Sequence, residues 1–262
     1  MTLTQRALVE AVLVGALCGA VGVHIVLRRL PFFAVAVSHA ALPGVVVASV
    51  VGLSVFVGSA VASLVLVAAV ALLGSARRLD ASTATGVALA GAFAVGVLVQ
   101  SSQPGASKDL AAFLVGSILT VQGGDLVLSG VVVAVIGLVL VAAHKELVLA
   151  AFDPEGAASM GYRPLWLDVT VLSIVAFTVA TSVAAVGTIL VVALLVTPAL
   201  AARLWVDRVG PMMALAAGIG AVSGIIGLEV SDRWNVAAGA SIALSATAIL
   251  LLSAAGTRVL RR

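Results

Sequence analysis

Long apolar runs fill most of this chain and decide what it can fold into. Of its 262 residues, 63% are hydrophobic and only 10% are charged, and the mean hydropathy is +1.29. A soluble domain carries about 25% charged residues, so this composition excludes one. Because a helix that crosses a bilayer needs about 20 apolar residues, the length allows roughly eight to ten crossings. We predict an all-α, polytopic bundle of membrane helices, a single transmembrane domain over residues 1–262.

Nine segments have the length and apolarity expected of a crossing helix. They lie at residues 8–27, 31–52, 54–74, 84–100, 125–143, 165–186, 187–204, 211–229 and 237–255. The run at 110–120 is apolar but has about half the length that a crossing requires, so it is predicted to be a re-entrant or interfacial helix. The alternative is that it forms a tenth crossing.

The distribution of basic residues distinguishes nine crossings from ten. Nine crossings place eleven of the 14 Lys and Arg residues on one side of the membrane and three on the other. A tenth crossing at 110–120 changes this division to nine and five. Lys and Arg are enriched in cytoplasmic loops, so nine crossings are favoured. We expect the N-terminus outside the cell and the C-terminus in the cytoplasm.

Ionisable side chains inside the predicted crossings are candidate sites, because they are costly in a bilayer unless paired or hydrated. His39 lies within the second crossing, in the string SHAALPG, and Pro43 follows one turn later. A neutral imidazole is a common ligand of transition metals, and a proline kinks its helix and frees a carbonyl. His39 and Pro43 therefore indicate a transport pathway or metal site. The alternative is a histidine that hydrogen-bonds to a neighbouring helix and serves packing.

Two further features belong to this set of candidates. Pro198, in LLVTPALAA, is a second proline within a crossing and predicts a kink or hinge. Glu229 and Asp232 lie with Arg233 at the outer side, where they form either a vestibule for cations or an ordinary solvated loop. Other charged or titratable residues lie within about a turn of a predicted crossing end, where a charged head can reach water. They include Glu10, His24 and Asp168.

The longest predicted cytoplasmic loop contains the signature of a short helix, FDPEGAASMGYRP at 152–164. Asp153 is a good N-cap, Pro154 suits the first helical position, and Glu155 favours the positive end of the helix. Small residues, including Ala157, follow, and Gly161 is expected to end the helix. Such a helix can dock in a groove of a partner protein; the alternative is a simple turn.

Missing motifs narrow the class of function. The chain has no GxxxxGK[ST] loop, so it does not bind and hydrolyse ATP by that device. It also lacks HExxH and a pair of aspartates within the crossings, which argues against intramembrane proteases. We therefore expect a transport protein that is not itself an enzyme.

Five segments carry a resemblance to a known family, in the same order along the chain. They are residues 28–47, 113–126, 152–161, 186–204 and 227–244. Together they resemble the permease subunit of ABC importers for divalent metals, the family of zinc and manganese uptake permeases. The resemblance implies a type II ABC-importer-like permease of about nine transmembrane helices in the bacterial cytoplasmic (inner) membrane.

The resemblance also implies partners. It implies a homodimer with alternating access at its interface, two ABC ATPase subunits that hydrolyse ATP, and an extracytoplasmic substrate-binding protein. It implies no nucleic acid and no covalently bound cofactor. The segment with Asp153, Glu155, Ala157 and Gly161 is similar to the coupling helix that such permeases insert into the ATPase.

One departure from the family pattern concerns the substrate. The family usually has an aspartate four residues before the histidine, and this chain has Val35 there. Near the outer end it has Asn235 and Ala237 where an aspartate and a proline are usual. A single imidazole without a carboxylate is a poor cation site, which argues against a bare Zn²⁺ or Mn²⁺ ion held by His39 alone.

Three explanations stay open. Glu229 or Asp232 supplies a carboxylate, two copies of His39 meet across the dimer, or the substrate is a chelated metal, haem or a non-metal solute. The predicted function is uptake of a divalent transition metal, zinc or manganese. The rival from another class is an ion-coupled secondary transporter, which needs titratable groups near the middle of the membrane. A structural membrane scaffold is a third reading.

Overall fold

The computed structural model describes residues 2–74, 81–102, 118 and 121–260, and within them it contains helices and no strand. This confirms the all-α prediction. The helices are α1 (Leu3–Leu27), α2 (Pro31–Val51), α3 (Val55–Gly74), α4 (Ala81–Ser101), α6 (Gly123–Ala142), α7 (His144–Phe152), α8 (Pro154–Ser159), α9 (Pro164–Val186), α10 (Thr188–Arg203), α11 (Val209–Trp234) and α12 (Ala238–Leu260).

Nine of these helices correspond to the nine predicted crossings, but one of them is short. In the described part of the chain, 8 helices are long and apolar enough to cross a membrane. The ninth, α10, has 16 residues, a length of about 24 Å against a hydrocarbon core of about 30 Å. The apolar run at 110–120 lies outside the described residues except for Ile118, which is buried.

The short α10 begins inside the bundle. Only Gly187 separates it from α9, with a φ of 83° that side chains rarely adopt. Thr188 and Leu190, which follow this corner, are both buried. The chain therefore turns inside the protein, where other helices and not lipid surround the backbone groups of the turn.

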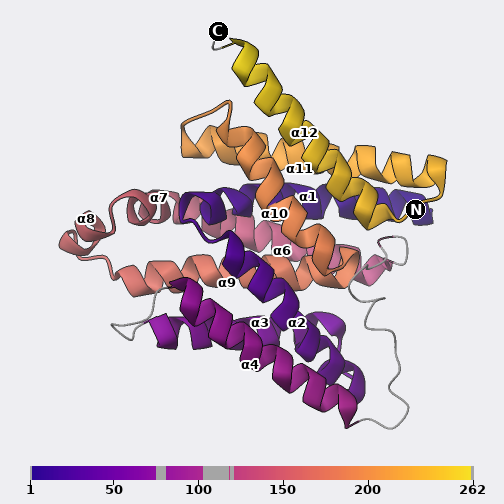
Figure 1. The fold of residues 1–262 in the computed structure, drawn as a ribbon, viewed down its shortest axis with the longest axis horizontal. Coiled ribbons are helices and arrows are strands. Elements are labelled where there is room, and N and C mark those ends of the chain that lie inside the picture. Colours follow the sequence, from indigo (N-terminus) through magenta and orange to yellow (C-terminus); the bar gives the residue numbers. More distant parts are fainter. Residues whose placement is uncertain (1, 75–80, 103–117, 119–120, 261–262) are drawn as a thin grey trace.

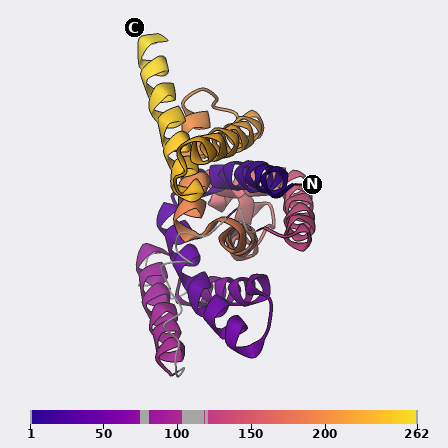
Figure 2. The same cartoon turned by 90° about the vertical axis from the view of Figure 1, so that its right-hand side faces the viewer.

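Helix α1 is the centre of the bundle, and Figures 1 and 2 show it between α11 on one side and α6 and α9 on the other. Its contact with α11 is made by glycines. A Cβ added at Gly15 would collide with the carbonyl oxygen of Gly220, and one added at Gly19 would collide with that of Ala216. Backbones that approach this closely are typical of membrane helices, which gain van der Waals contact through small residues.

Helices α2, α3 and α4 form a second group beside this centre (Figure 1). Glycines also allow close contact between α2 and α3, because a Cβ at Gly44 would collide with the carbonyl oxygen of Gly58. Helix α4 crosses Pro43 of α2 at Gly96, where an added Cβ would lie 2.6 Å from the proline Cγ. The group therefore packs closely around the proline of α2.

The contact between α1 and α11 generates a stability prediction. Replacing Gly220 by Val would press a side chain against the backbone of Gly15, and overpacking of this kind costs about 1–3 kcal/mol. We expect the purified chain in detergent to unfold at a lower temperature. Gly218→Val is the matched control, because a Cβ at Gly218 of the same helix meets nothing within 4 Å. Equal unfolding temperatures for the two variants would contradict the close packing.

Candidate functional site

The short helix predicted at 153–161 forms, and its chemistry is the expected one. Helix α8 begins at Pro154, and the carboxylate of Asp153 accepts a hydrogen bond of 2.8 Å from the backbone N–H of Gly156. Beyond the end of the helix, Gly161 has a φ of 89°. The cap, the proline and the glycine thus fix both ends of a helix too short to be stable alone.

Helices α7 and α8 form an elbow that projects from one end of the bundle (Figure 1). Within α8 the side chain of Ala157 is fully buried, whereas Glu155 is exposed. Large apolar side chains flank the helix and are also exposed: Phe152 is 65% and Met160 is 69% accessible. An acidic tip with apolar flanks is a surface suited to a groove on another protein.

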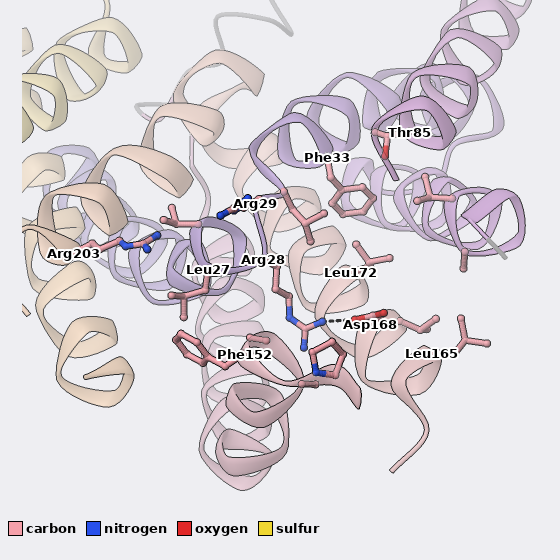
Figure 3. Close-up of a pocket in the computed structure, with 18 residues that line it drawn as sticks. Leu27, Arg28, Arg29, Phe33, Thr85, Phe152, Leu165, Asp168, Leu172 and Arg203 are labelled. Carbon is pink, nitrogen blue, oxygen red and sulfur yellow. Dashed lines mark hydrogen bonds and ion pairs between the residues drawn. The ribbon is translucent and has the colours of Figure 1, made fainter. Parts of the chain in front are cut away.

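An ion pair ties the base of the elbow to the central helix (Figure 3). Arg28, at the end of α1, pairs with Asp168 in the first turns of α9. It also donates a hydrogen bond of 3.3 Å to the carbonyl of Leu147 in α7. The Arg28 side chain is 8% exposed and that of Asp168 is 56% exposed. One guanidinium therefore connects α1, α7 and α9 at the end where the elbow projects.

The pair lies in a cavity of about 770 Å³ behind the elbow. Its lining includes the ends of α1, α10 and α7 and the starts of α2, α4 and α9. These helix ends flank four loops predicted to be cytoplasmic, at 28–30, 75–83, 144–164 and 203–210, so the structure brings the described ends of these helices together. Sequence reasoning placed Asp168 at a crossing end but missed its partner. The sequence did contain one signal for this pair: Arg28 and Asp168 are both predicted at the cytoplasmic side.

The predicted pathway residues lie on two neighbouring helices. His39 is half-buried within α2, and Pro43 is buried one turn further along. Pro198 is buried in α10, which packs against α2. No hydrogen bond or ion pair joins His39 to another described residue, so the part of the chain seen here does not supply the partner that the packing interpretation requires. The imidazole remains available to other groups.

The two carboxylates predicted for the outer side are exposed. Glu229 and Asp232 are exposed at the end of α11, and Glu229 lies 3.9 Å from Arg233, with side chains 64% and 79% accessible. Among the described residues, no group of three or more His, Cys, Asp and Glu side chains could hold a metal ion. A multidentate cation site is therefore not built from the described part of one chain.

Two residues interpreted as interfacial are instead buried. Glu10 has no accessible surface, and its carboxylate accepts a hydrogen bond of 2.6 Å from the Ser129 hydroxyl of α6. His24 is 1% exposed, and neither ring nitrogen has a hydrogen-bond partner among the described residues. Both lie on α1, which begins earlier than predicted and is surrounded by other helices. Distance from a helix end is therefore a poor guide to hydration in this helix.

Comparison with known proteins gives a consistent result over nearly the whole chain. The ABC 3 transport family matches residues 1–257. The manganese transport system membrane protein MntC of Halalkalibacterium halodurans is 33% identical over 249 residues, which are 95% of this chain and 85% of that protein. The manganese import system permease protein ScaB of Streptococcus pneumoniae is 36% identical over 251 residues, covering 95% of this chain and 88% of that protein.

A solved structure agrees with these sequences. The structure of PsaBC from Streptococcus pneumoniae in complex with Fab has a TM-score of 0.86 to this chain at 33% identity. The match covers 97% of this chain and 91% of that one. The fold described above is therefore shared at a level of identity that also supports common descent.

The unequal burial of Arg28 and Asp168 predicts unequal effects of removing them. Asp168→Ala leaves a buried guanidinium without its anion and is expected to cost about 2 kcal/mol. Arg28→Met removes the buried charge and leaves an exposed carboxylate, so its cost is expected to stay below about 1 kcal/mol. Thermal unfolding of the purified variants measures the difference. A larger loss for Arg28→Met would mean that the hydrogen bond from Arg28 to the Leu147 carbonyl, and not the ion pair, holds the elbow.

Proposed function

This chain belongs to the ABC 3 transport family, and from that membership we propose that it is the permease subunit of an ATP-driven importer for a divalent transition metal, with manganese the first candidate. The names of its relatives MntC and ScaB support manganese. The observation that carries the proposal is the capped, exposed α8 at the end of a bundle of membrane helices. The permease supplies the pathway, and a partner supplies the hydrolysis of ATP.

In this proposal α8 couples the partner to the bundle. Two ATPase subunits bind the elbows of two permease copies from the cytoplasm, with Glu155 exposed toward them and Ala157 fixing the helix to its base. Movement of an elbow reaches α1 and α9 through the pair of Arg28 with Asp168 and the bond to Leu147. The rigid connection lets a small displacement at the surface act on the central helix.

The pathway is proposed to run along α2 and α10 at the interface of the homodimer. An extracytoplasmic binding protein delivers the substrate, and Pro43 and Pro198 allow their helices to bend during alternating access. His39 contacts the passing cation, and a second copy supplies another imidazole. Weak contact suits a pathway, because tight retention slows release.

Val35 makes a chelated metal the second candidate substrate. The described part of one chain has no group of three metal ligands, and the aspartate that usually accompanies the histidine is absent. A chelated metal, in which the chelator satisfies the coordination of the ion, needs fewer ligands from the permease. Zinc, haem and other solutes are further alternatives to manganese.

The first test addresses coupling. Glu155→Arg reverses the charge at the exposed tip of α8 and is expected to abolish co-purification of the ATPase subunit with the permease. Glu229→Arg is the matched control, because it makes the same change at an exposed position of the opposite end, and it should leave the complex intact. Uptake that continues without any ATPase would favour an ion-coupled secondary transporter and overturn the proposal.

The second test addresses the pathway. In vesicles that contain the complete transporter, His39→Ala is expected to lower ATP-dependent manganese uptake about tenfold, which corresponds to about 1.4 kcal/mol at the limiting step. Normal uptake would assign the imidazole to packing. Val35→Asp is the companion variant, since it restores the usual carboxylate one turn before His39. A large gain in manganese or zinc uptake would indicate that the natural substrate is a chelate or another solute.

A further inference from the structure

The carboxyl group of Glu10 is buried between α1 and α6, in the half of α1 that is predicted to face the outside of the cell. The residue has no accessible surface, and Ser129, which is 3% exposed, donates a hydrogen bond of 2.6 Å to its Oε1. Its Oε2 has no hydrogen-bond partner among the described residues. One oxygen of a fully buried carboxyl group is thus left without a donor.

A negative charge on this carboxyl group would be poorly satisfied. An ionised carboxylate offers about four acceptor positions, and the described residues supply one donor, the Ser129 hydroxyl. Ionised side chains within a membrane bundle are costly unless they pair with another group or face water. A neutral carboxylic acid carries no charge, and its carbonyl oxygen accepts the bond from Ser129. Its O–H group still lacks an acceptor, but this costs far less than an unpaired buried charge.

The charged neighbours on α1 and α6 do not offset a charge at Glu10. Arg6 lies four residues before Glu10, and Asp125 lies four residues before Ser129. This spacing puts each of them one turn nearer the outer end, on the same face of its helix. Asp125 is exposed and repels a second negative charge. Arg6 is half-buried, and within the described residues no ion pair joins it to Glu10.

The other helices around α1 bring no countercharge to Glu10 in the described part of the chain. Helix α11 packs against the face of α1 that carries its glycines, which is not the face of Glu10, and its Arg233 is exposed beside Glu229. The charged side chains of α9 and α10, Asp168 and Arg203, lie at the end of the bundle that carries the elbow. The free oxygen of the carboxyl group is therefore not paired with a base.

A proton fits this site better than a metal ion does. Mn²⁺, Mg²⁺ and Ca²⁺ take about six or more oxygen ligands. In the described residues, no group of three or more His, Cys, Asp and Glu side chains could hold a metal ion. Glu10 has no accessible surface, and the cavity of about 770 Å³ lies at the other end of α1. A proton needs neither further ligands nor space.

We propose that Glu10 is a proton-binding site and that the bound proton keeps α6 against α1. Helix α6 lacks the close packing that holds α11, because a Cβ added at its Gly130 or Gly137 meets nothing within 4 Å. Its Val131 and Val135 side chains are exposed. When the proton leaves for water at the outer surface, the charge left on Glu10 is stabilised only if water enters between the two helices. The contact is therefore closed with the proton bound and opens when the proton is released.

The contact between α1 and α6 is connected to the elbow through the chain. Helix α6 ends at Ala142 and α7 begins at His144, so a displacement of α6 reaches the α7–α8 elbow directly. Protons outside the cell would thus influence the end of the permease that meets the ATPase. This consequence rests on the proposed function, whereas proton binding at Glu10 does not. The two can be separated, because proton binding is measurable on the permease without its partners.

Infrared spectra of the purified full chain in detergent at neutral pH test the protonation directly. A protonated carboxyl group has a C=O stretching band separate from the bands of carboxylates, and we expect this band in the wild type and its loss in Glu10→Gln. Glu229→Gln is the matched control, because it makes the same change at an exposed position, and it should keep the band. Ser129→Ala should shift the band to higher frequency, since it removes the hydrogen bond to the carbonyl oxygen.

Two spectroscopic results would overturn the proposal. Identical spectra of the wild type and Glu10→Gln would mean that Glu10 is ionised in the folded chain. Loss of the band when Mn²⁺ or Na⁺ is added at constant pH would make Glu10 a ligand of a cation.

Thermal unfolding in detergent tests the effect of the proton on the contact. The folded chain holds a proton that the unfolded chain gives up to water, so stability falls as pH rises. From mildly acidic to mildly alkaline buffer, we expect the unfolding temperature of the wild type and of Glu229→Gln to fall by about 2–4 °C more than that of Glu10→Gln. The same dependence on pH in all three proteins would assign the carboxyl group to packing alone and defeat the proposal.

Discussion

The structure depends on how closely the backbone of α1 approaches its neighbours. In a bilayer, apolar side chains gain little by leaving lipid for protein, so helices associate mainly through dense packing and hydrogen bonds. Gly15 and Gly19 remove the side chains that would separate α1 from α11, and Gly22 does the same against the carbonyl of Leu195 in α10. This stripe of glycines at intervals of three to four residues fixes the rotation of α1. Everything attached to the ends of α1 takes its position from that rotation.

The position of Arg28 is the clearest consequence. Because α1 is locked by its glycines, its last turn presents Arg28 to Asp168 and to the carbonyl of Leu147. The α7–α8 elbow is therefore fastened to the most tightly packed helix of the bundle, although α8 itself buries little beyond Ala157. In the proposed function, this attachment lets a helix of 6 residues pass the movement of a partner to the bundle. Arg28 thus joins the closely packed α1 inside the bundle to the exposed elbow outside it.

The sequence predicts those features that depend on local chemistry. Apolar length located the crossing helices, and the cap at Asp153 with the stop at Gly161 located α8, because each of these signals acts within a few residues. It did not predict the burial of Glu10 or His24. Helix α1 is apolar around most of its circumference, so no amphipathic pattern reveals which face meets other helices. The pairing of Arg28 with Asp168 joins residues 140 positions apart and needs the tertiary arrangement to be seen.

The same distinction between local and tertiary information applies to His39. The sequence shows Val35 at the position where the family usually has an aspartate. The structure adds that no described neighbour holds the imidazole by a hydrogen bond. A histidine that neither packs through a bond nor shares a carboxylate binds a cation weakly when alone. In a pathway formed by two copies, weak ligands on each side offer a cation a succession of similar contacts, and no single one holds it long. In the proposed pathway, Val35 in place of the usual aspartate lowers the affinity for the cation, and it also lowers the barrier to leaving the site.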